Sequence, residues 1–159
     1  MPEASRANPP RIVLAFDFGK RRIGIACGDT ISRTAMPLAA LAHRDRHVPW
    51  EAIGRTFGEW QPAVAIVGLP YNVDGSESPL GREAREFAAQ LAGRFPIDVH
   101  LVDERYSSLE AAARLRQARA SGLRRRRVAK SDVDGAAACV ILERWFDEAG
   151  TEANALTNR

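Results

Sequence analysis

The order of the apolar runs along the chain constrains its fold more than any other feature. Short apolar runs extend from Ile12 to Asp17, from Ile23 to Gly28 and from about Ala35 to Leu41, with brief connections between them. Runs of this length and spacing predict three β-strands that pair as an antiparallel meander. The pattern then changes, because apolar residues recur at helical spacing from Trp50 to Trp60 and predict an α-helix there.

The second half of the chain alternates between strand and helix patterns. Ala63 to Pro70 and Asp98 to Glu104 are strand-like, and an amphipathic helix from Pro79 to Phe95 lies between them. A Ser-x-x-Glu capping box at Ser107 begins another helix, and the last helix follows from about Asp132. Strands that alternate with helices pair in parallel through crossovers. The sequence therefore predicts an α/β, RNase H-like fold with one mixed five-stranded sheet and helices packed on it.

The expected domain occupies residues 11–149. The segments 1–10 and 150–159 are polar and lack periodicity, and we expect both to be disordered tails. The residues between them contain no linker and no repeat, which favours a single domain. No run approaches the roughly 20 apolar residues of a membrane span, and the first residues lack a signal-peptide pattern. The sequence thus favours a soluble, cytoplasmic protein.

Acidic residues occur where two of the predicted strands end. In the first strand, alternation places Asp17 on the same face as Val13 and Ala15, at the carboxyl end where open sheets bind ligands. Glu104 lies near the end of the strand that begins at Asp98. We expect these two strands to be neighbours, so that the carboxylates converge. An acid at the end of a buried strand is costly unless its charge is offset.

A third acid lies on the last predicted helix. Asp134 shares its helical face with Ala138, Ile141 and Trp145, the stripe that we expect to pack on the sheet. Asp132 lies about 200° around the helix from Asp134 and is better placed as an N-cap. The sequence therefore predicts that one acid from the last helix joins two acids from the strands.

Convergent carboxylates repel one another unless cations lie between them. Hard oxygen ligands suit Mg²⁺ or Mn²⁺, and two such ions about 4 Å apart activate a water and stabilise the leaving oxygen in phosphodiester cleavage. The histidines are scattered and are typical of surface or strand positions, which argues against zinc. For Asp17 alone, an ordinary ion pair with Lys20 or Arg22 stays an alternative.

Basic residues are concentrated before the last helix. The net charge is only +3, yet Arg124 to Arg127 are consecutive and Lys130 follows them. This run predicts an anion-binding surface, although a solvated loop in an arginine-rich chain has the same composition. Lys20 and Lys130 are the only lysines, and both flank candidate acids, which favours contact with phosphate. Gly19 and Gly24 are expected to allow a tight turn between the first strands.

Several sequence blocks resemble those of one known family. The blocks are "FDFGKRRIGIACGD", "GLPYNVDGSES", "VDERYSS" and "KSDVDGAAACVIL". In order and spacing they resemble the YqgF family, also called RuvX, of pre-16S rRNA nucleases and Holliday junction resolvase-like proteins, over about Arg11 to Phe146. The resemblance implies an RNase H-like fold and a metal-dependent nuclease that matures the 5′ end of small-subunit ribosomal RNA.

The resemblance also implies roles for single residues. The family's acids, which are catalytic residues and metal ligands, fall on Asp17, Glu104 and Asp134. From these motifs and the basic run, the residues expected to contact nucleic acid are Lys20, Arg22, Asn72, Arg105, Ser107, Arg124, Arg125, Arg126, Arg127 and Lys130. Related junction resolvases carry a further acid one helical turn from the last. Here Gly135, Ala137 and Ala138 surround Asp134, which argues against efficient junction cleavage.

The sequence leaves other functions open. Precursor rRNA is the expected partner and structured DNA the alternative, because the acids and the basic run serve either polymer. A non-catalytic RNA-binding module would keep the basic run but have no use for convergent acids. The first block also resembles the phosphate loop of actin-like ATPases, which need two such domains. We expect a monomer or a homodimer, and the sequence does not decide between them, although a junction resolvase should be a two-fold dimer.

Overall fold

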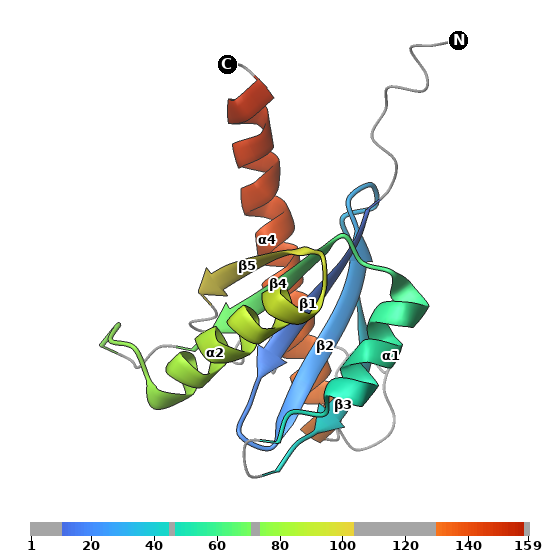
Figure 1. The fold of residues 1–159 in the computed structure, drawn as a ribbon. Coiled ribbons are helices and arrows are strands. Elements are labelled where there is room, and N and C mark those ends of the chain that lie inside the picture. Colours follow the sequence, from blue (N-terminus) through green and yellow to red (C-terminus); the bar gives the residue numbers. More distant parts are fainter. Residues whose placement is uncertain (1–10, 45–46, 71–73, 104–129, 158–159) are drawn as a thin grey trace, which may run out of the picture.

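The computed structural model describes residues 11–44, 47–70, 74–103 and 130–157, with the side chains of 135–148 in the last range. Figure 1 shows one twisted sheet with helices on both of its faces. The elements are β1 (Ile12–Phe18), β2 (Arg22–Asp29), β3 (Ala35–Ala42), α1 (Trp50–Trp60), β4 (Val64–Leu69), α2 (Pro79–Arg94), β5 (Asp98–Asp103) and α4 (Lys130–Thr157). The predicted strands and helices of residues 11–103 are all present, with bounds that agree within one residue.

The strands form one sheet in the order β3-β2-β1-β4-β5. The β1–β2 and β2–β3 pairs are antiparallel, and the β1–β4 and β4–β5 pairs are parallel, which confirms the predicted mixed five-stranded sheet. One expectation is wrong: β1 and β5 are not neighbours, because β4 lies between them. Connections between parallel strands are right-handed, so successive crossovers whose helices cover the same face move across the sheet in one direction. Strand β5 is therefore added beyond β4 and not beside β1.

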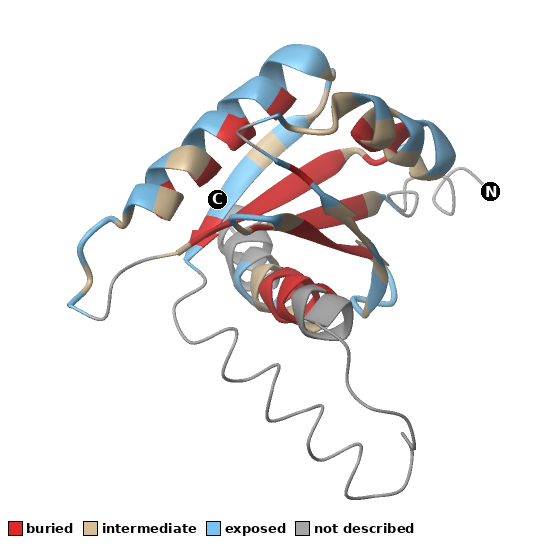
Figure 2. Cartoon of the chain, turned by 90° about the horizontal axis from the view of Figure 1, so that it is seen from below, coloured by how far each residue is buried: buried red, intermediate tan, exposed pale blue. Residues whose placement is uncertain are grey.

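Two hydrophobic cores lie on the two faces of the sheet (Figure 2). Successive side chains of a strand point to opposite faces. Strand β1 therefore directs Leu14 and Phe16 into the layer covered by α1 and α2, and Val13 and Ala15 toward α4. All four side chains are fully buried. The middle of β1 has no place for a charge, which confines polar residues of this strand to its ends.

The start of α2 is fixed by Ser78. Its hydroxyl accepts a hydrogen bond from the Gly81 amide at 2.9 Å and donates one to the Pro70 carbonyl at 2.9 Å. Pro79 takes the first helical position, where a missing amide hydrogen costs nothing. A Cβ on Gly81 would lie 2.6 Å from the Pro70 carbonyl oxygen. Glycine at this position thus lets the first turn of α2 approach the carboxyl end of β4.

Helix α4 differs from the prediction at both ends. It begins at Lys130, so Asp132 lies within the first turn and is not the N-cap. A negative charge in the first turn of a helix interacts favourably with the helix dipole. Helix α4 continues to Thr157, into the segment 150–159 that we expected to be a disordered tail. Alanine, glutamate and leucine in that segment extend a helix that is already nucleated. The segment 1–10 and the helix expected from Ser107 lie outside the described residues.

The described helices include none with the length and apolar character needed to cross a membrane.

The β2–β3 turn is organised by Asp29, at the opposite end of β1 from Asp17. The Asp29 carboxylate accepts hydrogen bonds from the Ser32 amide at 2.7 Å, the Ser32 hydroxyl at 2.8 Å and the Ile31 amide at 2.9 Å. These bonds, that of the Ser32 amide above all, hold the pKa of Asp29 below its ordinary value. Arg33 follows with a positive φ of 56°, and its guanidinium donates to the Phe146 carbonyl of α4.

We predict that Asp29→Ala lowers the melting temperature at neutral pH by a few degrees. The pKa of Asp29 is lower in the folded than in the unfolded state, so its contribution is complete above the unfolded-state pKa and is lost as the pH falls through the folded-state pKa. The difference from wild type should therefore shrink in acid. Thermal unfolding from neutral to acidic pH checks this, with Glu59→Ala, an exposed acid of α1, as the control. A deficit that does not change with pH would contradict the assignment.

Candidate active site

Asp17 lies at the carboxyl end of the central strand β1, one residue before the strand ends. Strand alternation gives it the same face as Val13 and Ala15, the face that α4 covers. It is half-buried, whereas Phe16 and Phe18 beside it are buried in the opposite layer. The sheet thus carries this carboxylate to the end of a fully buried strand, where water or a cation can reach it.

Glycines flank Asp17 on both neighbouring strands. In the register of the sheet, Asp17 is paired with Gly24 of β2 and with Gly68 of β4. Paired residues point to the same face, so neither strand places a side chain directly beside the Asp17 carboxylate. Beyond Gly24, the pairing of β2 with β3 shifts register between Ile23 and Ile25, an irregularity that is frequent next to active sites. The positions of β2 and β4 directly beside Asp17 therefore carry no side chain.

The role of these two glycines was not predicted from the sequence. We expected Gly24 to serve the turn after β1, whereas it lies inside β2, and Gly68 was not among the expected site residues. A glycine inside a buried strand often marks a close approach of a ligand or another backbone, and that signal was present in the sequence. Only the register of the sheet shows that both glycines are paired with the same aspartate.

The β1–β2 turn, which carries Lys20, is held by His43. The Gly19 amide donates to the Arg22 carbonyl at 2.9 Å, and a Cβ on Gly19 would lie 2.8 Å from that oxygen. The His43 amide donates to the Arg21 carbonyl at 2.9 Å, and its Nε2 lies 2.6 Å from the Gly19 carbonyl oxygen. We expected a surface or strand position for His43, and the structure places it directly after β3 as a buried residue. The sequence does not reveal its role, because the contact spans 24 residues.

Glu104 follows directly after β5 and lies outside the described residues. Strand β5 is separated from β1 by β4, whose Gly68 is paired with Asp17 on one side and with Val102 on the other. His100 and Val102 both pack against α4. Strand alternation therefore still predicts that Glu104, two residues after Val102, shares the face of Asp17.

The end of β5 is tied to α4 by Arg144. The Nη1 atom of Arg144 donates to the Asp103 carbonyl at 2.6 Å. Asp103 is the last residue of β5 and precedes Glu104, so this bond fixes the backbone from which Glu104 extends. The two residues are 41 positions apart, which is why no sequence pattern pointed to Arg144.

Helix α4 begins at the end of the sheet where β1 finishes (Figure 1). Near its start Gly135 is buried, and a Cβ there would lie 3.1 Å from the Pro37 Cβ of β3. Ala138 and Ile141 are fully buried against the sheet. Position 134 precedes these two by four and seven residues, which gives it their helical face. The side chain of Asp134 is outside the described part of the structure. The small residues that follow it, Gly135 and Ala138, let α4 pack closely against the sheet.

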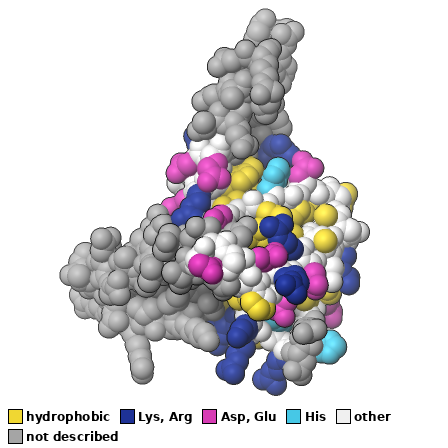
Figure 3. Space-filling model, turned by 90° about the vertical axis from the view of Figure 1, so that its left-hand side faces the viewer, with side chains coloured by type: hydrophobic (Ala, Val, Ile, Leu, Met, Phe, Trp, Pro, Cys, Tyr) yellow, Lys and Arg dark blue, Asp and Glu magenta, His cyan; other side chains and the backbone are white. Residues whose placement is uncertain are grey.

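The remaining candidates are divided between two parts of the chain. Lys20 is exposed in the β1–β2 turn, Arg22 is half-buried at the start of β2, and Lys130 is the first residue of α4. The others lie outside the described residues: Asn72, Arg105, Ser107, Arg124, Arg125, Arg126 and Arg127. In the view of Figure 3, basic, acidic and hydrophobic side chains are interspersed over the described surface, without a field of one sign.

The described part of the site fits a hard divalent cation. A carboxylate is the preferred ligand type, and the residues paired with Asp17 on β2 and β4 carry no side chain. Within the residues that the structure describes, no group of three or more candidate metal ligands occurs. Glu104 and the side chain of Asp134 are not among those residues. Cys27 and Cys139 are buried in separate cores, so the described thiols do not form a soft-metal site.

The chain was compared with known protein families and with curated sequences, and both comparisons indicate the same family. The sequence profile of RuvX, described as Holliday junction resolvase, matches residues 11–148. A protein of Edwardsiella ictaluri (strain 93-146) named "Putative pre-16S rRNA nuclease" is 46% identical over 138 residues, which are 87% of this chain and 96% of that protein. A protein of Yersinia pestis (strain Pestoides F) with the same name is 45% identical over the same shares.

Comparison with solved structures agrees with the described architecture. The yeast mitochondrial Holliday junction resolvase Ydc2 superposes with a TM-score of 0.53 at 10% identity, over 92% of this chain and 83% of that one. The Fowlpox virus resolvase, solved with Holliday junction DNA, gives 0.53 at 14% identity, over 87% of this chain and 98% of that one. At these identities the likeness concerns the fold alone, and it supports the predicted RNase H-like architecture. Because the profile covers nearly the whole described domain and the relatives share almost half of their residues with it, this chain belongs to the RuvX family.

Proposed function

We propose that this protein is a divalent-metal-dependent nuclease that processes the 5′ end of precursor 16S rRNA. Membership of the RuvX family makes it a hydrolase that acts on phosphodiester bonds of nucleic acid. The choice of precursor rRNA is supported by the names of relatives that are 46% and 45% identical. The observation that carries the proposal is the carboxylate of Asp17 at the end of a buried strand, with glycine on both sides.

In this proposal Asp17, Glu104 and Asp134 bind Mg²⁺ or Mn²⁺, with two ions in the site. Bound ions supply an activated water and stabilise the leaving oxygen. The chain holds the ligands in place. Burial of β1 fixes Asp17, the bond from Arg144 fixes the backbone before Glu104, and the close contact at Gly135 seats the start of α4 on β3. Such rigid support keeps charged ligands near one another despite their repulsion.

Nucleic acid contacts are assigned to basic residues on either side of the acids. Lys20 follows Asp17 by three residues, in the turn held by His43, and can bind a phosphate next to the one that reacts. Arg22 begins β2, and Lys130 begins α4 on the helix of Asp134. The residues outside the described part, Asn72, Arg105, Ser107, Arg124, Arg125, Arg126 and Arg127, are proposed to extend this surface. Phosphate contacts of this kind bind RNA and DNA alike.

Cleavage of Holliday junctions is the second candidate function. The description of the matching family and the fold of the two resolvases favour it. The positions after Asp134 weigh against it, because Ala137 and Ala138, one helical turn further, are buried and carry no acid. A resolvase would also need a two-fold dimer to cut two symmetric strands, whereas an rRNA nuclease can act as a monomer.

The proposed function predicts metal-dependent cleavage of precursor rRNA. Purified protein is incubated with labelled precursor 16S rRNA, single-stranded DNA and four-way junctions, each with Mg²⁺, Mn²⁺ or a chelator. We expect the precursor to be cut near its mature 5′ end with either metal, slower cutting of junctions, and no cutting with the chelator. Preferred junction cleavage would favour the resolvase function. Binding of RNA without cleavage under any metal condition would favour a non-catalytic RNA-binding module.

Asp17→Asn should abolish the response of the protein to metal. Mg²⁺ or Mn²⁺ stabilises the folded state when it binds that state alone, so both ions should raise the melting temperature of the wild type. The amide keeps the shape of the carboxylate but lacks its charge, and the shift should disappear while cleavage falls by orders of magnitude. The control is Asp98→Asn, because Asp98 is an exposed acid at the amino end of β5. Equal shifts in wild type and Asp17→Asn would remove Asp17 from the metal site.

Gly68→Ala should impair cleavage without unfolding the protein. The added Cβ stands on β4 between Asp17 and Val102, in the space that the proposal assigns to the metal and the phosphate. Small displacements of reacting groups are costly, and we expect a loss of about tenfold to a hundredfold in the cleavage rate. Gly58→Ala is the matched control, because a Cβ there meets nothing within 4 Å. Unchanged cleavage by Gly68→Ala, at an unchanged melting temperature, would show that this space is not used.

A further inference from the structure

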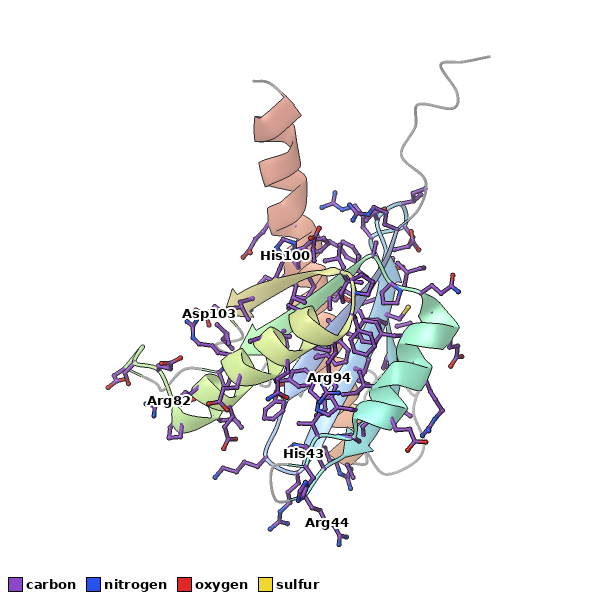
Figure 4. The ribbon with its side chains drawn as sticks, in the orientation of Figure 1. His43, Arg44, Arg82, Arg94, His100 and Asp103 are labelled. Atoms are coloured by element: carbon purple, nitrogen blue, oxygen red, sulfur yellow. The ribbon has the colours of Figure 1, made fainter. Side chains whose placement is uncertain are left out.

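One residue binds the backbone on both sides of Lys20. His43 follows β3, and its Nε2 lies 2.6 Å from the carbonyl oxygen of Gly19, the residue before Lys20. The His43 amide donates a hydrogen bond at 2.9 Å to the carbonyl of Arg21, the residue after Lys20. Figure 4 shows His43 at this end of the sheet, beside Arg44. The tip of the β1–β2 hairpin is therefore tied to the end of β3 by two atoms of one residue.

The two bonds differ in what they require of residue 43. The register of β2 and β3 ends with the pair of Arg22 and Ala42, so the bond from the His43 amide continues the antiparallel ladder and is compatible with most side chains. The bond to Gly19 needs a side-chain donor at the right distance. A carbonyl oxygen only accepts, so the proton of the neutral imidazole is on Nε2. The second bond is thus the one that depends on histidine.

The burial of His43 is not what stability alone would favour. The residue is 7% exposed, and its ring centroid lies 5.1 Å from that of Phe18. Nδ1 is then a buried acceptor, and within the described residues it has no hydrogen-bond partner. An unpartnered buried acceptor costs free energy that an apolar side chain of similar size would avoid. Gly19 is half-buried in its turn, so water can replace the imidazole at its carbonyl. The imidazole therefore contributes more to the position of the turn than to the stability of the fold.

Lys20 is the residue whose position depends on this turn. It is exposed and lies three positions after Asp17, a span of at most about 11 Å. Asp17 itself does not need His43, because β1 is paired there with Gly24 on one side and with Gly68 on the other. Lys20 belongs to no strand. Fixing the backbone of a flexible lysine reduces the entropy that is lost when its ammonium group binds a phosphate.

We propose that His43 is a positioning residue for the substrate. Its Nε2 proton holds the Gly19 carbonyl, and the turn then presents the Lys20 ammonium group to a phosphate beside the one that reacts. The inference rests on the proposed function, which assigns a phosphate contact to Lys20. It gives His43 an effect on substrate binding and none on the metal or on the chemical step. Loss of the donor at position 43 should accordingly weaken the binding of nucleic acid.

The first test compares His43→Leu with His43→Gln in the full chain. Leucine has no donor, whereas the amide nitrogen of glutamine is as many bonds from the backbone as Nε2 of histidine and can donate to Gly19. Binding of a short single-stranded RNA is measured by fluorescence anisotropy with a chelator present. We expect His43→Leu to weaken binding about threefold to tenfold, with an unchanged or higher melting temperature. His43→Gln should bind as the wild type does.

The matched control is His47→Leu. His47 is an exposed histidine in the segment that follows His43, so the same substitution there removes an imidazole without a change at the β1–β2 turn. This variant should bind RNA as the wild type does. Wild-type binding by a folded His43→Leu, or binding by His43→Gln as weak as that of His43→Leu, would overturn the proposal.

A double-mutant cycle shows whether His43 acts through Lys20. Each lysine contact with a phosphate contributes about one unit to the dependence of log affinity on log salt concentration, so Lys20→Ser should reduce this slope by about one. Adding His43→Leu to Lys20→Ser should then weaken binding no further, because the side chain that His43 positions is absent. An equal loss in both backgrounds would mean that His43 acts elsewhere and would overturn the proposal.

Cleavage and metal binding separate this role from a role at the active site. Removal of an interaction that is equally strong in the ground state and the transition state raises KM and leaves kcat unchanged. His43→Leu should therefore raise KM for precursor rRNA, with kcat and the rise of the melting temperature in Mn²⁺ close to those of the wild type. A fall in kcat together with a smaller response to Mn²⁺ would show that His43 acts on Asp17, against the proposal.

Two further measurements apply if His43→Leu does not fold. His43→Met, whose unbranched side chain adapts to the space, replaces it in the cycle. NMR of the imidazole nitrogens in the wild type should show a proton on Nε2 that exchanges slowly with water. A neutral ring with its proton on Nδ1 would leave Nε2 without a hydrogen to donate to Gly19 and would overturn the proposal.

The failure of this inference and the failure of the proposed function have different signs. RNA binding is measured without free metal, so the cycle gives a result whether or not the protein cleaves. Coupling between His43 and Lys20 without cleavage removes the nuclease function alone, and cleavage without coupling removes this inference alone. A wild type that does not bind RNA would overturn both.

Discussion

The burial of β1 on both faces is the constraint on which the rest of the structure depends. Val13, Leu14, Ala15 and Phe16 are each 0% exposed, and the strand is hydrogen-bonded to β2 on one edge and to β4 on the other. Burial of apolar surface is the main favourable term in folding, and here one strand provides it to both layers. A carboxylate cannot be accommodated inside such a strand, so Asp17 stands where the burial ends.

The same constraint determines what surrounds the acid. A carboxylate between two tightly paired strands would normally have side chains on both sides, yet Gly24 and Gly68 occupy the paired positions. Glycine weakens a strand, because it adds no packing and costs conformational entropy on folding. The structure tolerates this cost at the end of the central strand, next to the register shift of β2 and β3. A ligand that approaches the backbone needs positions without side chains, and the glycines and the register shift beside Asp17 are features of that kind.

The two faces of this sheet end have different chemistry. On the α4 face, small and apolar residues such as Gly135 and Ala138 bring the helix close to the strands, and position 134 lies at its near end. On the α1 and α2 face, aromatic residues form a wall, and His43 joins the end of β3 to the turn that follows Asp17. The β1–β2 turn with Lys20 connects to both faces, because it follows Asp17 in the chain and its Gly19 carbonyl is bound by His43.

The sequence by itself determined the strands and helices of residues 11–103, their order along the chain and the fold class, because strand alternation and helical spacing depend on residues that are close in the sequence. It also identified Asp17 as the acid at the end of a buried strand. Only the tertiary structure decided that β4 separates β1 from β5, that Gly24 and Gly68 are both paired with Asp17, and that Arg144 binds the carbonyl before Glu104. Strand order, register and contacts across 41 residues depend on how distant segments pack, and no local pattern encodes them.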